Sequence, residues 1–448
     1  MDRIENKGQA RILGHLFIIM ILDLLAFTCI LPLFPALMEF YAGFAKPGDL
    51  YSIFDKQLQY FRSWIGAPDM ARFNSVFFGG LLGSMFSFLQ FLSSPIFGAL
   101  SDIYGRKRMF QICIIGTLVS YILWARASTF GIFVLSRIVG GFCKASVSLS
   151  TAVVTDLMKE KNRGKGMAMI GVAFSMGFIF GPLIGAYFAT QARRDTSAAF
   201  YVTPAYFAII LTLVEFIWVY VFLPETLASE KRDKELGQVM QQASSYVNPI
   251  ALFGFKQLKL VDENKNTLKL PFLRRIGVVY FLYLLIYSGL EFTLSFFTHL
   301  RFGYDSMQQG RMYFFCGLLM VLLQGGYVRR VAAEKQKAAA QWGLAFIVPS
   351  FLLIGLARSK LMLYGGLALY SVASALVVTC LTTVVSSFGS ESEKGTILGV
   401  FRALGALARA AGPFIASAVF WLLGPTVAYV GGALLLLVPF LLLRQLKT

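Results

Sequence analysis

The chain has 448 residues, of which 57% are hydrophobic and 14% charged, and its formal net charge is +18. A soluble protein carries about 25% charged residues, so this composition excludes a single water-soluble globule. The positive charge does not require nucleic acid as a partner, because Lys and Arg lie mainly in loops between apolar runs, where membrane anchoring explains them.

Apolar runs recur along the chain at about the 20-residue length that a membrane-spanning helix needs. They lack the period-two alternation of barrel strands, so we predict an all-α integral membrane protein, inserted in a lipid bilayer. The first run is too long for a cleavable signal. About twelve spans are expected, over residues 12–38, 74–99, 109–125, 130–155, 166–190, 203–223, 276–299, 309–328, 339–357, 361–386, 396–420 and 425–443.

The order of the spans predicts two six-helix, pseudo-symmetric bundles. The N-terminal bundle covers residues 1–223, a charged cytoplasmic linker covers 224–275, and the C-terminal bundle covers 276–448. Lys and Arg are concentrated in the loops on one side, so both termini are expected in the cytoplasm.

The fifth span of each predicted bundle carries the same pattern. A basic residue followed by Gly comes just before each span, and each span contains a Gly-Pro pair, Gly181-Pro182 in the first and Gly412-Pro413 in the second. Parallel repeats of six helices are typical of secondary transporters.

The segment "GALSDIYGRKR" follows the second span and forms the next cytoplasmic loop. Gly98 would let two helices approach, Asp102 lies near a helix end, and Gly105 is suited to a tight turn. Arg106, Lys107 and Arg108 would face the inner leaflet or pair with carboxylates. A simple turn with positive anchors explains the three cations but not the spacing of the other residues.

This segment resembles the signature between spans two and three of the major facilitator superfamily. "LSRIVGG" (residues 135–141) resembles the span-four arginine motif, and "GFIFGPLIG" (residues 177–185) resembles the Gly-Pro signature of the antiporters in that superfamily. "LDLLAFTCILPLFP" (residues 22–35) and "FLPETL" (residues 222–227) resemble its drug–proton antiporter branch. The second half departs from the pattern, because Arg330 stands near an expected aspartate.

The resemblance implies a transporter that works by alternating access, with three groups of functional residues. Gly98, Asp102, Gly105 and the three following cations would form an inner gate. Asp23, near the membrane midplane, and Arg137 would couple transport to protons, with a static ion pair between them as the alternative. The antiporter-type Gly-Pro helix comprises Gly177, Gly181, Pro182 and Gly185.

Charged residues inside spans are costly unless they face a wet cavity or a partner. Lys144, Arg402 and Arg409 favour a basic cavity for an organic anion, although they would also balance Asp23, Glu215 and Glu291. Phe27 and Tyr287 would line an amphipathic, drug-sized pocket; helix packing also explains aromatic residues at these positions.

The sequence therefore predicts a secondary transporter for a small amphipathic molecule, an organic anion or a drug, and not an enzyme. A transporter-like receptor, scaffold or lipid handler without solute flux is the alternative. No phosphate-binding Gly-Lys loop occurs, and we expect no cofactor, no metal and a monomer. The chain has no Asn-x-Ser/Thr sequon, so an intracellular membrane remains open beside the plasma membrane.

Overall fold

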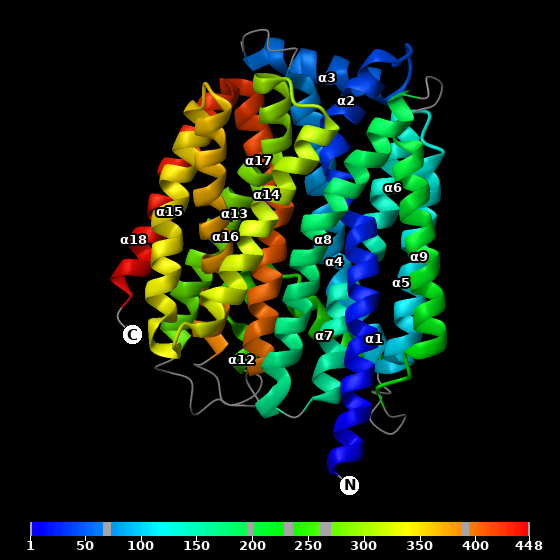
Figure 1. Ribbon diagram of the computed structural model, residues 1–448, viewed down its shortest axis with the longest axis vertical. Coiled ribbons are helices and arrows are strands. Elements are labelled where there is room, and N and C mark those ends of the chain that lie inside the picture. Colours follow the sequence, from blue (N-terminus) through cyan, green and yellow to red (C-terminus); the bar gives the residue numbers. More distant parts are fainter. Residues whose placement is uncertain are drawn as a thin grey trace. The chain divides into compact units, whose positions relative to one another are not determined.

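The computed structural model of the protein describes residues 2–65, 73–158, 160–194, 200–227, 236–259, 270–386 and 394–446. Within these ranges the regular structure is helical throughout (Figure 1). The helices of the first half are α1 (Asp2–Thr28), η1 (Leu31–Leu33), α2 (Phe34–Gly43), α3 (Leu50–Ile65), α4 (Asn74–Tyr104), α5 (Arg106–Ala125), α6 (Phe130–Cys143), α7 (Ser146–Leu157), α8 (Glu160–Arg194) and α9 (Val202–Phe222).

The second half begins with short helices in the predicted linker and continues with long ones. They are α10 (Leu236–Ser245), α11 (Pro249–Phe253), α12 (Lys256–Lys259), α13 (Leu270–Phe302), α14 (Ser306–Gly326), η4 (Val328–Arg330), η5 (Ala333–Lys335), α15 (Gln336–Leu356), α16 (Lys360–Ser386), α17 (Lys394–Leu435) and α18 (Leu437–Gln445).

Ten helical stretches of the described residues are long and apolar enough to cross a membrane. Two differences separate this number from the twelve predicted spans. The last stretch, Thr396–Gln445, joins two predicted spans, and Gly424 with a φ of 82° breaks its helical backbone between them. The helix α14 matches the predicted span at 309–328 but is not among the ten.

The chain divides into two compact units, which are described separately. Unit 1 contains Met1–Ile53, Leu89–Ser244 and Asp305–Phe314, and unit 2 contains Phe54–Phe88, Ser245–Tyr304 and Phe315–Thr448. This division does not test the bounds of the two predicted bundles, which stay a prediction.

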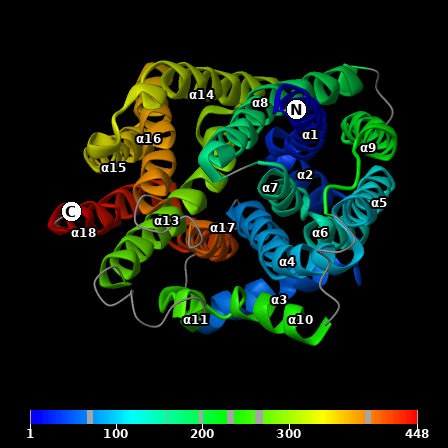
Figure 2. The same ribbon diagram turned by 90° about the horizontal axis from the view of Figure 1, so that it is seen from below.

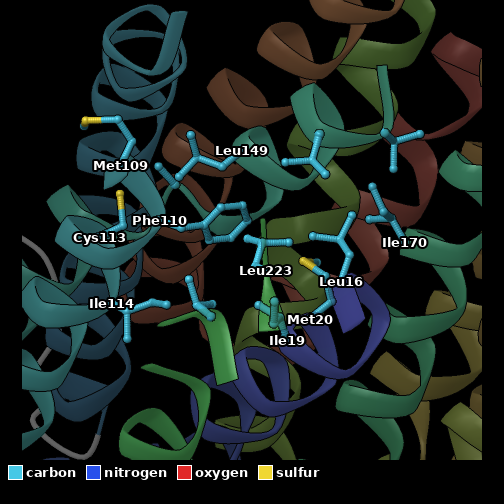
Figure 3. Close-up of a cluster of buried hydrophobic side chains, with 14 of the residues drawn as sticks. Leu16, Ile19, Met20, Met109, Phe110, Cys113, Ile114, Leu149, Ile170 and Leu223 are labelled. Carbon is cyan, nitrogen blue, oxygen red and sulfur yellow. The ribbon is translucent and has the colours of Figure 1, made fainter. Parts of the chain in front are cut away.

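The interior of unit 1 contains a cluster of aliphatic and aromatic side chains. Leu16 and Met20 come from α1, Phe110 from α5 and Leu149 from α7, and all are buried. In Figure 3 the ring of Phe110 lies among side chains from these helices and Leu223, the residue after α9. Because lipid is as apolar as these side chains, close packing rather than water exclusion stabilises the cluster.

Close helix pairs in the two units follow the predicted repeat. In unit 1, α8 packs on α1, and in unit 2, α17 packs on α13 (Figure 2). A methyl group added to Gly181 would overlap Thr28, and one added to Gly412 would overlap Ser288. The two Gly-Pro helices therefore use small residues to approach the first helix of their own unit.

Two hydrogen bonds between neighbouring helices, one in each unit, also follow the predicted repeat. The Ser120 hydroxyl of α5 donates to the Ser136 carbonyl of α6 at 2.7 Å, and the Ser350 hydroxyl of α15 donates to the Gly366 carbonyl of α16 at 2.8 Å. Both serines are buried, so each bond ties two adjacent spanning helices together.

The predicted span at 130–155 is not one continuous helix. α6 ends at Cys143 and α7 begins at Ser146, with Lys144 at φ −80° and ψ 67° between them. Non-helical backbone at membrane depth occurs where protein or a water-filled cavity surrounds it. A hydropathy pattern reports apolar length and not hydrogen bonding, so it does not reveal this break.

Candidate functional site

Asp23 and Lys144 form a buried ion pair in unit 1. The Lys144 ammonium contacts Oδ1 of Asp23, and the Ser146 hydroxyl donates to Oδ2 at 2.5 Å. Both charged residues are 3% exposed. Phe27 covers the pair, because the Lys144 ammonium lies 4.9 Å from the centre of its ring. Each carboxylate oxygen of Asp23 therefore has a protein donor.

The break between α6 and α7 positions this pair. Lys144 follows the last residue of α6, and its carbonyl accepts a hydrogen bond from the Gln90 amide of α4 at 3.1 Å. Ser146 begins α7, so the N-terminal end of a twelve-residue helix lies beside the Asp23 carboxylate. The free N–H groups and dipole of such an end stabilise a negative charge.

The expected partnership of Asp23 with Arg137 is not present, because Lys144 pairs with Asp23 instead. Arg137 is 3% exposed, and its guanidinium lies 5.6 Å from the Trp124 ring centre and 5.4 Å from that of Phe133. Its Nε donates to the Ser136 hydroxyl at 3.3 Å. One terminal nitrogen has no hydrogen-bond partner among the described residues. Cation–π contacts thus replace the expected carboxylate.

Glu215 of α9 lies in the same interior and is 1% exposed. Its charge interacts with those of Asp23 and Lys144. No described residue donates a hydrogen bond to its Oε1. The four predicted intramembrane charges of unit 1 are therefore two acids and two cations within one buried region.

A second polar cluster lies in unit 2, around Glu291 of α13. The hydroxyls of Tyr370 and Tyr287 donate to Glu291 Oε1 at 2.6 Å and 3.3 Å. Tyr287 also lies 2.6 Å from the Ser374 hydroxyl, and its ring stacks on that of Tyr370. Tyr287 is thus part of a hydrogen-bonded cluster rather than only a packing residue.

Arg402 and Arg409 lie on α17 and are both exposed. They are seven positions apart, so they occupy one face of the helix. The charges of both interact with Tyr280 of α13, and Arg409 also interacts with Glu291. An arginine exposed to lipid inside a span would be costly, so a wet cavity remains the expected surrounding of both.

The loop "GALSDIYGRKR" forms a charged cluster centred on Arg106. Its guanidinium contacts Asp102 at 2.6 Å, Asp156 of α7 at 2.9 Å and the Ser101 hydroxyl at 2.5 Å. The Glu225 carboxylate, in "FLPETL", accepts the backbone N–H of Arg106 at 2.9 Å. Ends of α4, α5, α7 and α9 are thus joined through one arginine and one helix cap.

The remaining residues of the loop have separate roles. Gly105 has a φ of 97° and is the single residue between α4 and α5, which confirms the predicted tight turn. A methyl group at Gly98 would meet only Ser148 of α7, at an ordinary 3.4 Å, so helix packing does not require this glycine. The Lys107 ammonium donates to the Tyr220 carbonyl at 2.8 Å, and Arg108 is exposed.

The antiporter-type glycines lie against α1. A methyl group added at Gly177 would crowd Leu24, and one added at Gly185 would crowd Cys29. One added at Gly181 would likewise crowd Thr28. The Thr28 hydroxyl donates to the Gly177 carbonyl at 2.7 Å. Pro182 lies inside α8. Among the residues described, no group of His, Cys, Asp and Glu side chains could hold a metal ion.

Comparison with known proteins decides the family. The model of the Major Facilitator Superfamily matches residues 16–413. The chain belongs to the major facilitator superfamily. Its fold is the two-bundle, all-α fold of that superfamily, and the protein is a multi-pass membrane transporter.

Individual relatives refine this placement within the superfamily. Human major facilitator superfamily domain-containing protein 10 is 44% identical to this chain, over 99% of this chain and 94% of its own length. Its structure, that of the human organic anion transporter MFSD10 (TETRAN), gives a TM-score of 0.80 over 97% of this chain and 99% of that one. The class B tetracycline resistance protein of Escherichia coli is 23% identical to this chain, over 80% of this chain and 82% of its own length. The resemblance of the sequence to the major facilitator superfamily is confirmed.

Several residues of these clusters escaped the sequence-based prediction. They are Ser146, Asp156, Glu225, Tyr370 and Ser374. For Asp156 a signal was available, because it is an acid at the cytoplasmic end of a predicted span, as Asp102 is. Nothing in the sequence distinguishes Ser146 or Ser374 from the many other serines in apolar segments.

Proposed function

We propose that this transporter moves small amphipathic organic anions and that it is a proton-coupled secondary transporter. In this proposal, the arginine face of α17 in unit 2 binds the anionic group, and the Asp23–Lys144 pair in unit 1 responds to protons. Alternating access would link the two events.

The excess of positive charge on α17 is the observation that carries the anion proposal. Arg402 and Arg409 are exposed on one face, and Glu291 is the single predicted intramembrane acid of unit 2. Planar guanidinium groups bind carboxylates with two parallel hydrogen bonds. The description of human MFSD10 as an organic anion transporter is consistent with this assignment.

The environment of Asp23 supports a role in proton coupling. Lys144 contacts one of its carboxylate oxygens and Ser146 donates to the other, beside the start of α7. A movement that separates α1 from the break after α6 would remove these interactions. The proposal links that movement to proton binding at Asp23.

Uptake into proteoliposomes tests the substrate class. The purified protein is given an aromatic carboxylate or its uncharged amide, each with and without an imposed pH gradient. We expect uptake of the carboxylate, acceleration by the gradient, and loss of carboxylate uptake in Arg409→Gln. Arg358→Gln is the matched control, because Arg358 is exposed outside the predicted spans.

Two outcomes would contradict the proposal. Equal uptake of carboxylate and amide would exclude selection for anions. Specific binding of the carboxylate without uptake would instead favour the receptor or scaffold alternative.

A further inference from the structure

A groove on the surface of unit 1 lies between α5 and α9. It has a volume of about 470 Å³ and is lined by Arg108, Gln111, Ile112, Ile115, Phe216 and Tyr220. The four α5 residues follow a helical spacing, so they form one stripe, and the two α9 residues, four apart, form the facing stripe.

The groove changes from charged to apolar along its length. Arg108 and Gln111 lie in the first two turns of α5, at the predicted cytoplasmic side, and Ile112 and Ile115 follow. Seven residues of helix span about 10 Å. Ile112 is 52% exposed and Ile115 48% exposed, so the apolar part of the groove is open on the surface of unit 1.

The cation at the head of the groove, Arg108, has no partner among the described residues of unit 1. Arg106 contacts Asp102 and Asp156, and the Lys107 ammonium donates to the Tyr220 carbonyl. No described residue contacts the Arg108 guanidinium in this way. The carboxylate of Glu225 is directed at the backbone N–H groups of Arg106 and Lys107. Arg108 is therefore available to a ligand from outside the chain.

We propose that this groove binds one anionic glycerophospholipid of the cytoplasmic leaflet. The phosphate and acidic headgroup contact Arg108 and Gln111, and an acyl chain lies along Ile112, Ile115 and Phe216. The charge of the headgroup complements the arginine, and the order of polar and apolar walls matches a lipid inserted from that side. This site is separate from the proposed substrate and proton sites.

Native mass spectrometry of the full-length protein tests the site, with phosphatidylserine and phosphatidylcholine of identical chains as probes. We expect the wild type to prefer phosphatidylserine, and Arg108→Gln to reduce that preference about five-fold, as expected for one cation near a lipid headgroup. Ile115→Trp, which fills the apolar part, should weaken binding of both lipids.

Arg126→Gln is the matched control, because Arg126 is exposed at the opposite end of α5. It should leave the preference for phosphatidylserine unchanged. Three results would overturn the proposal: no preference in the wild type, an equal loss in the Arg126 variant, or full competition by soluble glycerol phosphate. The last result would show a phosphate site without a lipid requirement.

Discussion

At the scale of single residues, the intramembrane charges of unit 1 have other partners in the structure than the sequence predicted. Asp23 contacts Lys144, while Arg137 lies against two aromatic rings. Both cations lie on the predicted fourth span, and a charge motif cannot show which of them faces α1. The backbone break beside Lys144 decides it, because it ends α6 and directs that side chain toward Asp23.

Asp23→Asn should abolish the response of uptake to an imposed pH gradient, because the amide cannot exchange a proton. It should also destabilise the protein, since removing one partner of a buried ion pair costs about 3–5 kcal/mol. Uptake and thermal unfolding are measured together. A double variant with Lys144→Gln should recover stability but not the pH response; proton-driven uptake with unchanged pH dependence in Asp23→Asn would refute the assignment.

Glu291→Gln should lower the KM for an anionic substrate. The glutamine oxygen still accepts from Tyr370, but the negative charge that interacts with Arg409 is removed. Arg409 is exposed, and a charge interaction with an exposed partner contributes up to about 1 kcal/mol, or roughly five-fold in affinity. Initial uptake rates over a range of carboxylate concentrations give the KM, and an unchanged or raised value would argue against Arg409 as the anion site.

At the scale of elements, small residues set the distances between helices. Three glycines of α8 face α1 at positions where a methyl group would overlap Leu24, Thr28 or Cys29. The Gly-Pro pattern predicted this helix, whereas its partner became evident only in the structure. The same relation between α17 and α13 supports an origin of the two halves by duplication.

Gly181→Ala should destabilise the protein by about 1–3 kcal/mol, as for overpacking in a well-packed interior. Its methyl group would overlap the Thr28 hydroxyl, which already bonds the Leu24 and Gly177 carbonyls. Gly171→Ala is the control on the same helix, because nothing lies within 4 Å of that position. Thermal unfolding in detergent measures both, and equal melting temperatures for the two variants would contradict the packing assignment.

At the scale of the whole molecule, the Arg106 cluster joins the ends of four elements in unit 1. Arg106 contacts carboxylates of α4 and α7, while Glu225 caps α5 from beyond α9. Loss of one carboxylate therefore affects several helices together. The inner-gate role remains a prediction from the superfamily signature.

Asp102→Asn should shift the carrier toward its inward-open state, because it removes one of the two carboxylates that contact Arg106. A cysteine introduced at Tyr104, which is 50% exposed at the end of α4, should then react faster with a membrane-impermeant maleimide. Asp49→Asn, in an exposed turn before α3, is the control. Unchanged labelling together with unchanged transport would refute the gate.

The sequence by itself determined the class of the protein, most of its helices and the residues of its charged loop. Apolar length, basic loops and glycine at turns are local properties, so they can be interpreted without knowing which segments meet. The tertiary structure alone decided that Lys144 and not Arg137 pairs with Asp23, that Ser146 and Tyr370 join the polar clusters, and that Glu225 caps α5. These contacts join residues 79 to 123 positions apart, and only the packing of distant helices brings them within hydrogen-bonding distance.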